Sequence, residues 1–334
     1  MSDGVGEVQR GLRVRSPQDV RRVLVLRGGA IGDMMLTVPA LAAIRRHWPA
    51  ARIELAARSP AAALAKEGGL VDDVLSLESG EVSRLFVGRI EPDPERAARF
   101  AGIEVAVNYL HDPDGRVSRH LAAAGVRGVM AGSPIVTEGH AVDHFLRVLG
   151  ANGVPVEYGA APRLEVPAPR VACGREWARA LGGAAIVLHP GSGSARKNWP
   201  LGHFVSLARR LREKTSFRPV FCTGEADAAL AREVAEGPEG FVLMSDVALP
   251  ELAGRLVAAA AFVGNDGGIT HLAAAAGAPV VALFGPTDPD TWGPRGDHVT
   301  RVVAAERSVE GLRRIRVDDV WSALMGRIGD RAGG

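Results

Sequence analysis

Residues 23–33 read Val-Leu-Val-Leu-Arg-Gly-Gly-Ala-Ile-Gly-Asp, and this stretch decides the fold class of the chain. A short apolar run leads into a glycine-rich turn, and an amphipathic stretch then continues to about His47. Continuous apolar runs of this length are typical of strands that are covered on both faces, as in parallel sheets. A second apolar run at residues 53–57 follows the helical stretch, so the unit of strand, turn and helix begins again. The pattern predicts an α/β protein with a parallel sheet.

The alternation of short apolar runs and helical patterns extends through the chain with one interruption. Residues 150–169 are rich in Pro, Gly and Ala, which predicts an interdomain linker. We therefore expect two doubly wound, Rossmann-like domains that face an interdomain cleft, because ligands of such sheets bind outside the carboxyl ends of the strands. The expected segments are a flexible leader (1–20), a first domain (21–155), a linker (156–170) and a second domain with a closing C-terminal helix (171–334).

The composition is that of a globular protein of about two domains. The 334 residues include 40 basic and 38 acidic side chains, a net charge of +2, and only two cysteines. The balanced charge argues against nucleic-acid binding through bulk electrostatics, and two cysteines exclude a disulfide framework. No apolar run reaches the length of about 18 residues that a membrane span needs, and residues 1–20 lack a secretory apolar core. We therefore expect a cytoplasmic protein.

Asp33 ends the glycine-rich turn and stands at the expected start of the first helix. The glycines at 28, 29 and 32 do not have the spacing of a dinucleotide-binding turn, and no Lys-Ser/Thr pair makes a P-loop. A carboxylate here has two interpretations. It caps the helix, which typically stabilises a protein by about 1 kcal/mol, or it acts as a general base beside the cleft. The spacing leaves both open and argues against a Rossmann oxidoreductase.

A polar loop at residues 189–200 follows the strand expected at 186–188. It reads His-Pro-Gly-Ser-Gly-Ser-Ala-Arg-Lys-Asn-Trp-Pro and includes Lys197, one of only three lysines in the chain. Backbone N–H groups released by Gly and Ser can cradle an anion, and a lysine adds a mobile positive charge. The loop therefore favours phosphate binding over the alternative of an ordinary polar connection.

Two further strand ends carry polar residues on the expected cleft side. Glu225 follows the strand expected at 219–222 and either binds ribose hydroxyls or starts the next helix. Residues 266–268 (Asp-Gly-Gly) lead into a short Ala-rich helix, whose free N–H groups suit a phosphate. His271 in that helix is either a ligand contact or a histidine bonded to the backbone.

Four motifs, in chain order, resemble the signatures of glycosyltransferase family 9, the bacterial ADP-heptose:lipopolysaccharide heptosyltransferase family. They are Gly-Ala-Ile-Gly-Asp at 29–33, His-Pro-Gly at 189–191 with Lys-Asn-Trp-Pro at 197–200, residues 264–274, and Phe-Gly-Pro-Thr-Asp-Pro at 284–289. The matches are spread over residues 23–294, which is most of the chain. The chain departs from the family's pattern at residues 28–29 and 267–268, both Gly-Gly, and Asn108 stands where the family often has an Asp.

The resemblance implies the two-domain GT-B architecture and an inverting, metal-independent transfer of heptose. The donor would be ADP-heptose in the second domain, and the acceptor a lipid A–core oligosaccharide on the first, with no cofactor and no metal site. Asp33 would be the general base, and Lys197 would neutralise the donor diphosphate. The donor would contact a set of loop residues, namely Ser192, Gly193, Lys197, Glu225, Asp266, Gly267, Gly268 and His271. The acceptor would meet Gly32, Arg116 and Arg119.

The implied partners are a nucleotide sugar and a lipid-linked oligosaccharide, with peripheral contact at the cytoplasmic face of the inner membrane and no nucleic acid. Within the enzyme class, the alternatives are transfer of another nucleotide-linked sugar and transfer to a protein. Outside it, the alternative is a non-catalytic scaffold that binds nucleotide sugars. The joint presence of Asp33 and Lys197 favours an enzyme, because a pure binding protein needs no base.

Overall fold

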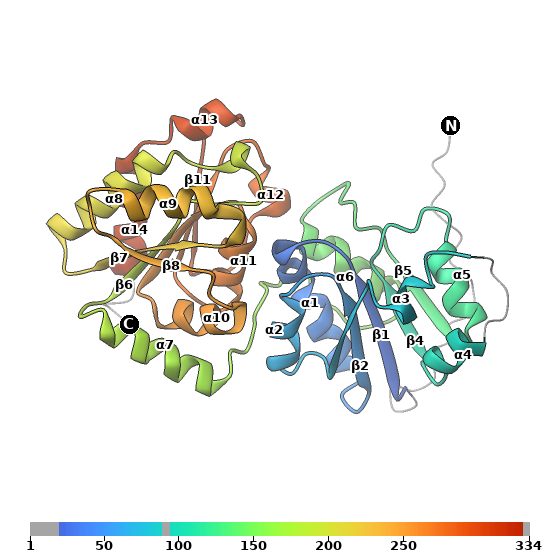
Figure 1. The fold of residues 1–334 in the computed structure, drawn as a ribbon. Helices are drawn as coiled ribbons and strands as arrows, with labels where there is room; N and C mark the ends of the chain where they lie inside the picture. The colour runs from blue at the N-terminus through green and yellow to red at the C-terminus, as the bar shows by residue number, and fades with distance from the viewer. Residues whose placement is uncertain (1–19, 89–93, 330–334) are drawn as a thin grey trace.

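The computed structural model describes residues 20–88 and 94–329, which form two α/β lobes lying side by side (Figure 1). Residues 1–19 of the expected leader lie outside the described residues. Each lobe contains one sheet, and the strand pairs of both sheets run parallel. The expected α/β class with two parallel sheets is therefore confirmed. Among the described residues, no helix has the length and the apolar character needed to cross a bilayer.

The first lobe is built on a five-stranded sheet with the order β3-β2-β1-β4-β5. Its strands are β1 Arg22–Arg27, β2 Arg52–Ala57, β3 Asp73–Ser76, β4 Val105–Asn108 and β5 Gly128–Ala131. One face is covered by α1 Ile31–His47, α2 Ala62–Glu67 and α6 Ala141–Ala151, and the other by α3 Gly80–Ser83, α4 Pro94–Phe100 and α5 Arg116–Ala123. Val23 and Val25 pack on the first face, whereas Leu24 and Leu26 pack on the second. Burial on both faces explains why this strand is apolar at consecutive positions.

The second lobe is built on a six-stranded sheet with the order β11-β10-β9-β6-β7-β8. Its strands are β6 Ala185–His189, β7 Arg218–Thr223, β8 Val242–Ser245, β9 Ala261–Asn265, β10 Val280–Phe284 and β11 Val299–Val303. Its helices are α7 Ala168–Ala180, α8 Leu201–Lys214, α9 Ala228–Glu236, α10 Leu249–Ala258, α11 Gly268–Ala275, α12 Pro289–Trp292, α13 Val309–Arg313 and α14 Val317–Gly329, with 3-10 turns η2 Ala195–Lys197 and η3 Glu225–Asp227. Helices α8 and α14 cover one face, and α10 and α11 cover the other.

The connection between the lobes runs from the end of α6 to the start of α7. Helix α7 begins at Ala168, so residues 168–170 of the expected linker form its first turn. This helix packs closely on α10, where a Cβ added to Gly174 would overlap the backbone of Gly254. The second-lobe helices therefore begin slightly earlier in the chain than the composition suggests.

Apolar and polar contacts both join the two lobes. One apolar cluster extends from α1 and α6 of the first lobe to α10 and α11 of the second. His140, which caps α6, uses its Nε2–H to donate to the carbonyl oxygen of Gly293 at 2.8 Å. Arg295 forms a bidentate ion pair with Asp143, with N–O distances of 3.0 and 2.6 Å. These contacts hold the two sheets in a defined relative position.

Candidate active site

Both sheets have the reversal of strand order at which doubly wound sheets bind ligands. The reversal lies between β1 and β4 in the first sheet and between β6 and β9 in the second. Ligands bind at such a point outside the carboxyl ends of the strands. Helix α1 starts after β1 and helix α11 starts after β9, and the two helices contact each other. The two expected binding regions therefore meet.

Asp33 occupies the third position of α1 and caps that helix. Its Oδ2 accepts a hydrogen bond from the N–H of Ala30 at 2.9 Å, and its Oδ1 lies 3.2 Å from Nη2 of Arg27. Gly29 has a φ of +94°, and a Cβ there would lie 2.6 Å from the Asp33 side chain. The carboxylate remains 38% exposed. Capping is thus compatible with a second role, because one contact on each oxygen leaves lone pairs for a substrate hydroxyl.

Arg27, the last residue of β1, is a site residue that the sequence analysis did not identify. Its side chain is only 2% exposed, and Nε donates to Thr37 Oγ1 at 2.9 Å. The guanidinium carbon lies 4.4 Å from the ring centroid of Phe145. Burial lowers the pKa of Arg27, and the neighbouring Asp33 carboxylate opposes that shift. A charged residue at the end of an apolar run is the sequence signal that points to it.

In the second lobe, Lys197 and the turn before α11 form one polar cluster. Nζ of Lys197 lies 3.0 Å from Oδ2 of Asp266, which also accepts a hydrogen bond from Thr287 Oγ1 at 2.7 Å. Nε2 of His271 lies 3.9 Å from the other carboxylate oxygen. Burial lowers the pKa of His271 to about 4, so the ring is neutral near pH 7. Lys197 is 30% exposed, which leaves its ammonium group open to a ligand.

Asn265 joins the polar loop at residues 190–198 to the end of β9. Its Oδ1 accepts from the N–H of Trp199 at 2.9 Å, and its Nδ2 donates to the carbonyl oxygens of Pro190 and Gly191. Within the loop, the Ser192 hydroxyl lies 2.6 Å from the backbone carbonyl oxygen of Ser194 and accepts from its N–H. Ser192 therefore fixes the loop conformation through its side chain.

Two of the glycines expected at the site, Gly32 and Gly268, lie where the two lobes contact each other. A Cβ added to Gly32 would lie 3.4 Å from Cδ2 of His271, and one added to Gly268 would lie 2.8 Å from Cβ of Ile31. Gly267 faces the loop, since its Cβ would lie 3.4 Å from Cα of Ser192. The structure thus brings together the first-lobe pair Gly32 and Asp33 and the second-lobe group Lys197, Asp266, Gly267, Gly268 and His271.

Glu225 begins the 3-10 turn η3, just after the carboxyl end of β7. It lines a hollow of about 450 Å³, whose other lining residues are Thr223, Gly224, Ala228, Ala231 and Asp246. This volume is in the range of small-molecule sites. Asp227 accepts from the N–H of Gly224 at 3.2 Å and lies so close to Gly191 that a Cβ there would overlap its carboxylate. The hollow therefore borders the loop that contains Ser192 and Gly193.

Arg116 and Arg119 lie on the exposed side of α5 in the first lobe. Within the described part of the chain, neither guanidinium group has an ion-pair partner, whereas Asp112 caps α5 by accepting from two backbone N–H groups of that helix. Asn108, at the end of β4, donates to the Asp112 carboxylate at 3.2 Å. The structure gives no contact between these arginines and Asp33.

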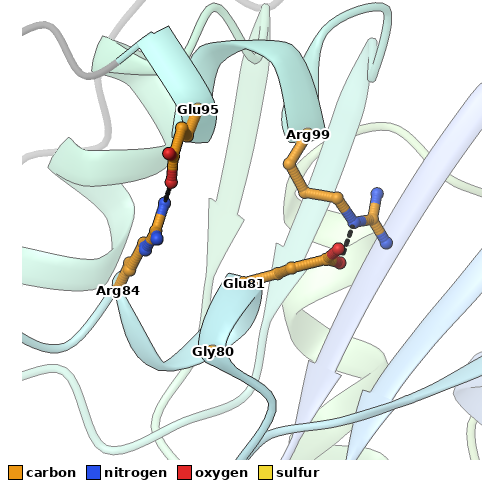
Figure 2. A pocket seen from close by; sticks show the side chains of 5 residues that line it. All are labelled: Gly80, Glu81, Arg84, Glu95 and Arg99. Carbon is orange, nitrogen blue, oxygen red and sulfur yellow. Dashed lines mark hydrogen bonds and ion pairs between the residues drawn. The ribbon is translucent and has the colours of Figure 1, made fainter.

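A second hollow, of about 300 Å³, lies between α3 and α4 and is separate from this site (Figure 2). Its charged residues are already matched, because Arg84 pairs with Glu95, and Arg99 lies 2.8 Å from Glu81. It therefore offers no unmatched charge to a ligand.

Comparisons with known proteins identify relatives of this chain. The model of glycosyltransferase family 9 (heptosyltransferase) matches residues 136–316. Lipopolysaccharide heptosyltransferase 3 of Escherichia coli is 24% identical over 308 residues, which cover 82% of this chain and 86% of the relative. Lipopolysaccharide heptosyltransferase 1 of Pseudomonas aeruginosa is 33% identical over 111 residues, which cover 33% of this chain and 31% of the relative.

Solved structures of such proteins share the fold. The family 9 glycosyltransferase of Veillonella parvula has a TM-score of 0.77 at 21% identity, and the match covers 93% of this chain and 98% of that one. ADP-heptose lipopolysaccharide heptosyltransferase II of Escherichia coli has a TM-score of 0.76 at 18% identity and covers 93% and 100%. The expected GT-B architecture is confirmed by these likenesses.

Proposed function

The chain belongs to glycosyltransferase family 9, and we propose that it transfers a heptose from ADP-heptose to a lipopolysaccharide core acceptor. Its relatives supply the sugar and the acceptor class, since they are named as lipopolysaccharide heptosyltransferases. The observation that supports the chemistry is the contact of α1 with α11. It puts a partly exposed carboxylate, Asp33, opposite a cluster that offers a lysine and a helix N-terminus.

The donor diphosphate is proposed to bind at Lys197 and at the first turn of α11. The first N–H groups of a helix have no partner within the helix, and the helix dipole favours an anion there. Oδ2 of Asp266 lies 3.0 Å from Nζ of Lys197 and orients that ammonium group. This role accounts for the presence of a carboxylate beside the proposed diphosphate site. Ser192 and Gly193 border the same space, and the hollow beside Glu225 would take the ribose and base.

The acceptor is proposed to approach from the first lobe, past Gly32, with Arg116 and Arg119 contacting its acidic groups. Guanidinium groups suit the phosphates and carboxylates of a lipid-linked core, because they form bidentate hydrogen bonds with such anions. The location of this acceptor implies peripheral contact with the inner face of a membrane.

The reaction is proposed to be one displacement with inversion at the anomeric carbon. The acceptor hydroxyl oxygen forms a bond to that carbon as the bond to the diphosphate oxygen breaks. Asp33 takes the hydroxyl proton, and ADP leaves with the electron pair of the broken bond. A general base of this kind typically contributes about 10²–10⁴-fold to the rate.

Charge compensation for the departing diphosphate is proposed to come from the protein and not from a metal. Lys197 supplies a full positive charge, and the N-terminus of α11 supplies about half a charge. His271 is neutral, since burial lowers its pKa to about 4, so it contributes a hydrogen-bond donor and no charge. Transfer is therefore expected to persist in excess EDTA.

Calorimetric titration with ADP, UDP, GDP and NAD, without added metal, tests the donor site. ADP is expected to bind best, and Lys197→Ala is expected to weaken ADP about ten- to hundredfold, as for loss of a charged hydrogen bond. Lys214→Ala, at the end of α8, is the matched control and should bind as the wild type does. A preference for UDP or GDP would assign another nucleotide sugar. The absence of nucleotide binding would contradict the donor site proposed for the second lobe.

Asp33→Asn tests the catalytic step. This variant should keep its affinity for ADP and lose transfer by about 10²–10⁴-fold, measured as ADP released from ADP-heptose with a lipid-core acceptor. Asp73→Asn, at the amino end of β3, removes a carboxylate far from the α1–α11 contact and should leave transfer unchanged. Equal rates for Asp33→Asn and wild type would contradict the role of Asp33.

A further inference from the structure

Arg27 is an unusual residue even in a chain so rich in arginine. Three lysines among 40 basic residues leave 37 arginines. Among the residues that the structure describes, Arg27 is the only arginine with a buried side chain. It ends β1, the strand beside the reversal of strand order in the first sheet. Its position therefore places a buried positive charge beside Asp33, at the carboxyl end of that strand.

The guanidinium group of Arg27 is fixed on several sides. Nε donates to Thr37 Oγ1 at 2.9 Å, and Nη2 lies 3.2 Å from Oδ1 of Asp33 and 3.4 Å from its carbonyl oxygen. Phe145 lies under the guanidinium plane at 4.4 Å, and the hydroxyl of Tyr109 donates to the carbonyl oxygen of Phe145 at 2.9 Å. Nε, Nη2 and one face of the group thus have an assigned neighbour on α1 or α6.

Arg27 reaches the site only through Asp33. Its own side chain is 2% exposed, whereas the Asp33 carboxylate is 38% exposed. A substrate hydroxyl can therefore touch the carboxylate but not the guanidinium group. Without Arg27, only the hydrogen bond from the N–H of Ala30 would restrain the rotation of the carboxylate about its Cβ–Cγ bond.

A buried guanidinium group is a costly way to fill this position. Removing a charge from water is unfavourable, and an apolar residue of similar volume often stabilises a fold equally well or better. Val23 and Val25, which precede Arg27 on the same face of the strand, show that apolar residues fit this region. Packing alone therefore does not explain the charge of Arg27. Its carboxylate partner is Asp33, which indicates that Arg27 holds the Asp33 carboxylate.

We propose that Arg27 is a positioning residue of the transfer reaction, which holds the Asp33 carboxylate in the orientation that receives the acceptor proton. This inference rests on the proposed function. Arginine is required because its fork donates to Thr37 and Asp33 in different directions while its plane stacks on Phe145. A lysine supplies the charge without the fork.

A double-mutant cycle on kcat tests this role. Arg27→Met is expected to lower kcat by about 10- to 100-fold when Asp33 is present, with the donor KM changed by less than about threefold. Arg27→Lys should recover part of this loss. In the Asp33→Asn background, Arg27→Met should lower kcat by less than about twofold, because the residue it acts through is gone. Equal losses in both backgrounds would overturn the proposal.

Arg99→Met is the matched control in the same lobe. Arg99 pairs with the buried Glu54 at 2.8 Å and lies 5.6 Å from the ring centroid of Phe100, but far from α11. Its loss should lower the melting temperature and leave kcat unchanged. A parallel fall of kcat and stability in both variants would instead assign Arg27 a structural role only.

Crystal structures test whether Arg27 orients the Asp33 carboxylate, and they do so without a measurement of enzyme activity. Wild type should show one orientation of the Asp33 carboxylate, and Arg27→Met should show it rotated or in several conformers. An unchanged single orientation would overturn the proposal. If Arg27→Met does not fold, Arg27→Lys is used in its place, with rotation of the carboxylate expected and no rotation as the refuting result. Failure of wild type to transfer heptose would contradict the proposed function alone, since the orientation of Asp33 is read independently.

Discussion

Asn265→Asp exchanges one nitrogen for an oxygen at the centre of the donor-side loops. The side chain is fully buried, and Nδ2 donates to the carbonyl oxygens of Pro190 and Gly191 at 2.8 and 3.3 Å. Oδ1 accepts from the N–H of Trp199 at 2.9 Å. The substitution hardly changes the volume. It removes both donors, however, and an ionised carboxylate would face two carbonyl oxygens.

The loss of stability should depend on pH. Each carbonyl left without a donor costs about 1–3 kcal/mol, which gives roughly 2–6 kcal/mol for the ionised form. The charge facing two carbonyl oxygens puts the ionised form at the upper end of that range. Protonation restores one donor and leaves one carbonyl without a donor, so the neutral form costs about 1–3 kcal/mol plus about 1.4 kcal/mol per pH unit above about 3.9. The sum is about 5–7 kcal/mol at pH 7 and about 2.5–4.5 kcal/mol at pH 5. The folded variant adopts whichever of the two forms, ionised or protonated, costs less free energy. The introduced group has a higher pKa folded than unfolded, so the damage shrinks as the pH falls.

Urea titrations of wild type and variant at pH 7 and pH 5 measure this difference. Asn265→Asp should lose about 5–6 kcal/mol at pH 7 and about 2.5–4.5 kcal/mol at pH 5. Asn152→Asp is the matched control. Asn152 ends α6, is only partly buried and donates to the carbonyl oxygen of Val148, so its loss should be small at both pH values. A loss below about 1 kcal/mol at pH 7, or the same loss at both pH values, would refute the reasoning.

Close helix packing, a buried histidine and the ion pair between the lobes give three more expectations. Gly174→Ala would overlap the backbone of α10 and should cost about 1–3 kcal/mol, whereas Gly326→Ala in α14 meets open space and should gain about 1 kcal/mol in urea titrations. Similar changes for both would contradict the packing. Burial lowers the pKa of His271 to about 4, so the unfolded chain binds its proton first and stability should fall from pH 7 to pH 4. His271→Asn should reduce that slope of melting temperature against pH, and an unchanged slope counts against the burial argument. Arg295→Met should cost about 1–2 kcal/mol, because both partners of the pair are about one-quarter exposed. Adding Asp143→Asn to the Arg295→Met variant should cost little further stability. If the losses of the two single variants simply add, the ion pair contributes nothing to stability.

The sequence predicts the inner strands of both sheets well. The apolar runs at 23–26, 53–57, 105–107, 186–188 and 280–284 all lie within strands of the structure. These strands are buried on both faces, so their apolar character is continuous. The edge strands β3, β5 and β11 were not predicted, because each has only four or five residues and includes exposed positions. A hydrophobic pattern of four or five residues cannot be distinguished from that of a loop.

The site is predictable where a loop carries an unusual residue. Lys197 and Asp266 were identified because they stand in glycine-rich turns after strands, and they form an ion pair in the structure. The contact of Gly32 with His271 was not predictable in detail, because it depends on how the two lobes are joined by apolar packing. Spacing along the chain says nothing of a contact between segments more than 200 residues apart.

Arg27 and Asn265 show that the last residue of a strand is a sequence signal for residues that support the site. Each is the last residue of its strand, and the same holds for three other buried polar residues, Asn108, His189 and Thr223. A polar side chain at that position is covered by the neighbouring strand ends, so it must find partners there. Arg27 and Asn108 bond to the loop or helix that follows, and Asn265 bonds to the adjacent loop. The residues proposed to meet substrate come one to eleven positions later. A polar residue that ends an apolar run in a parallel sheet therefore indicates a buried support of the site, whereas the turn after it indicates the site itself.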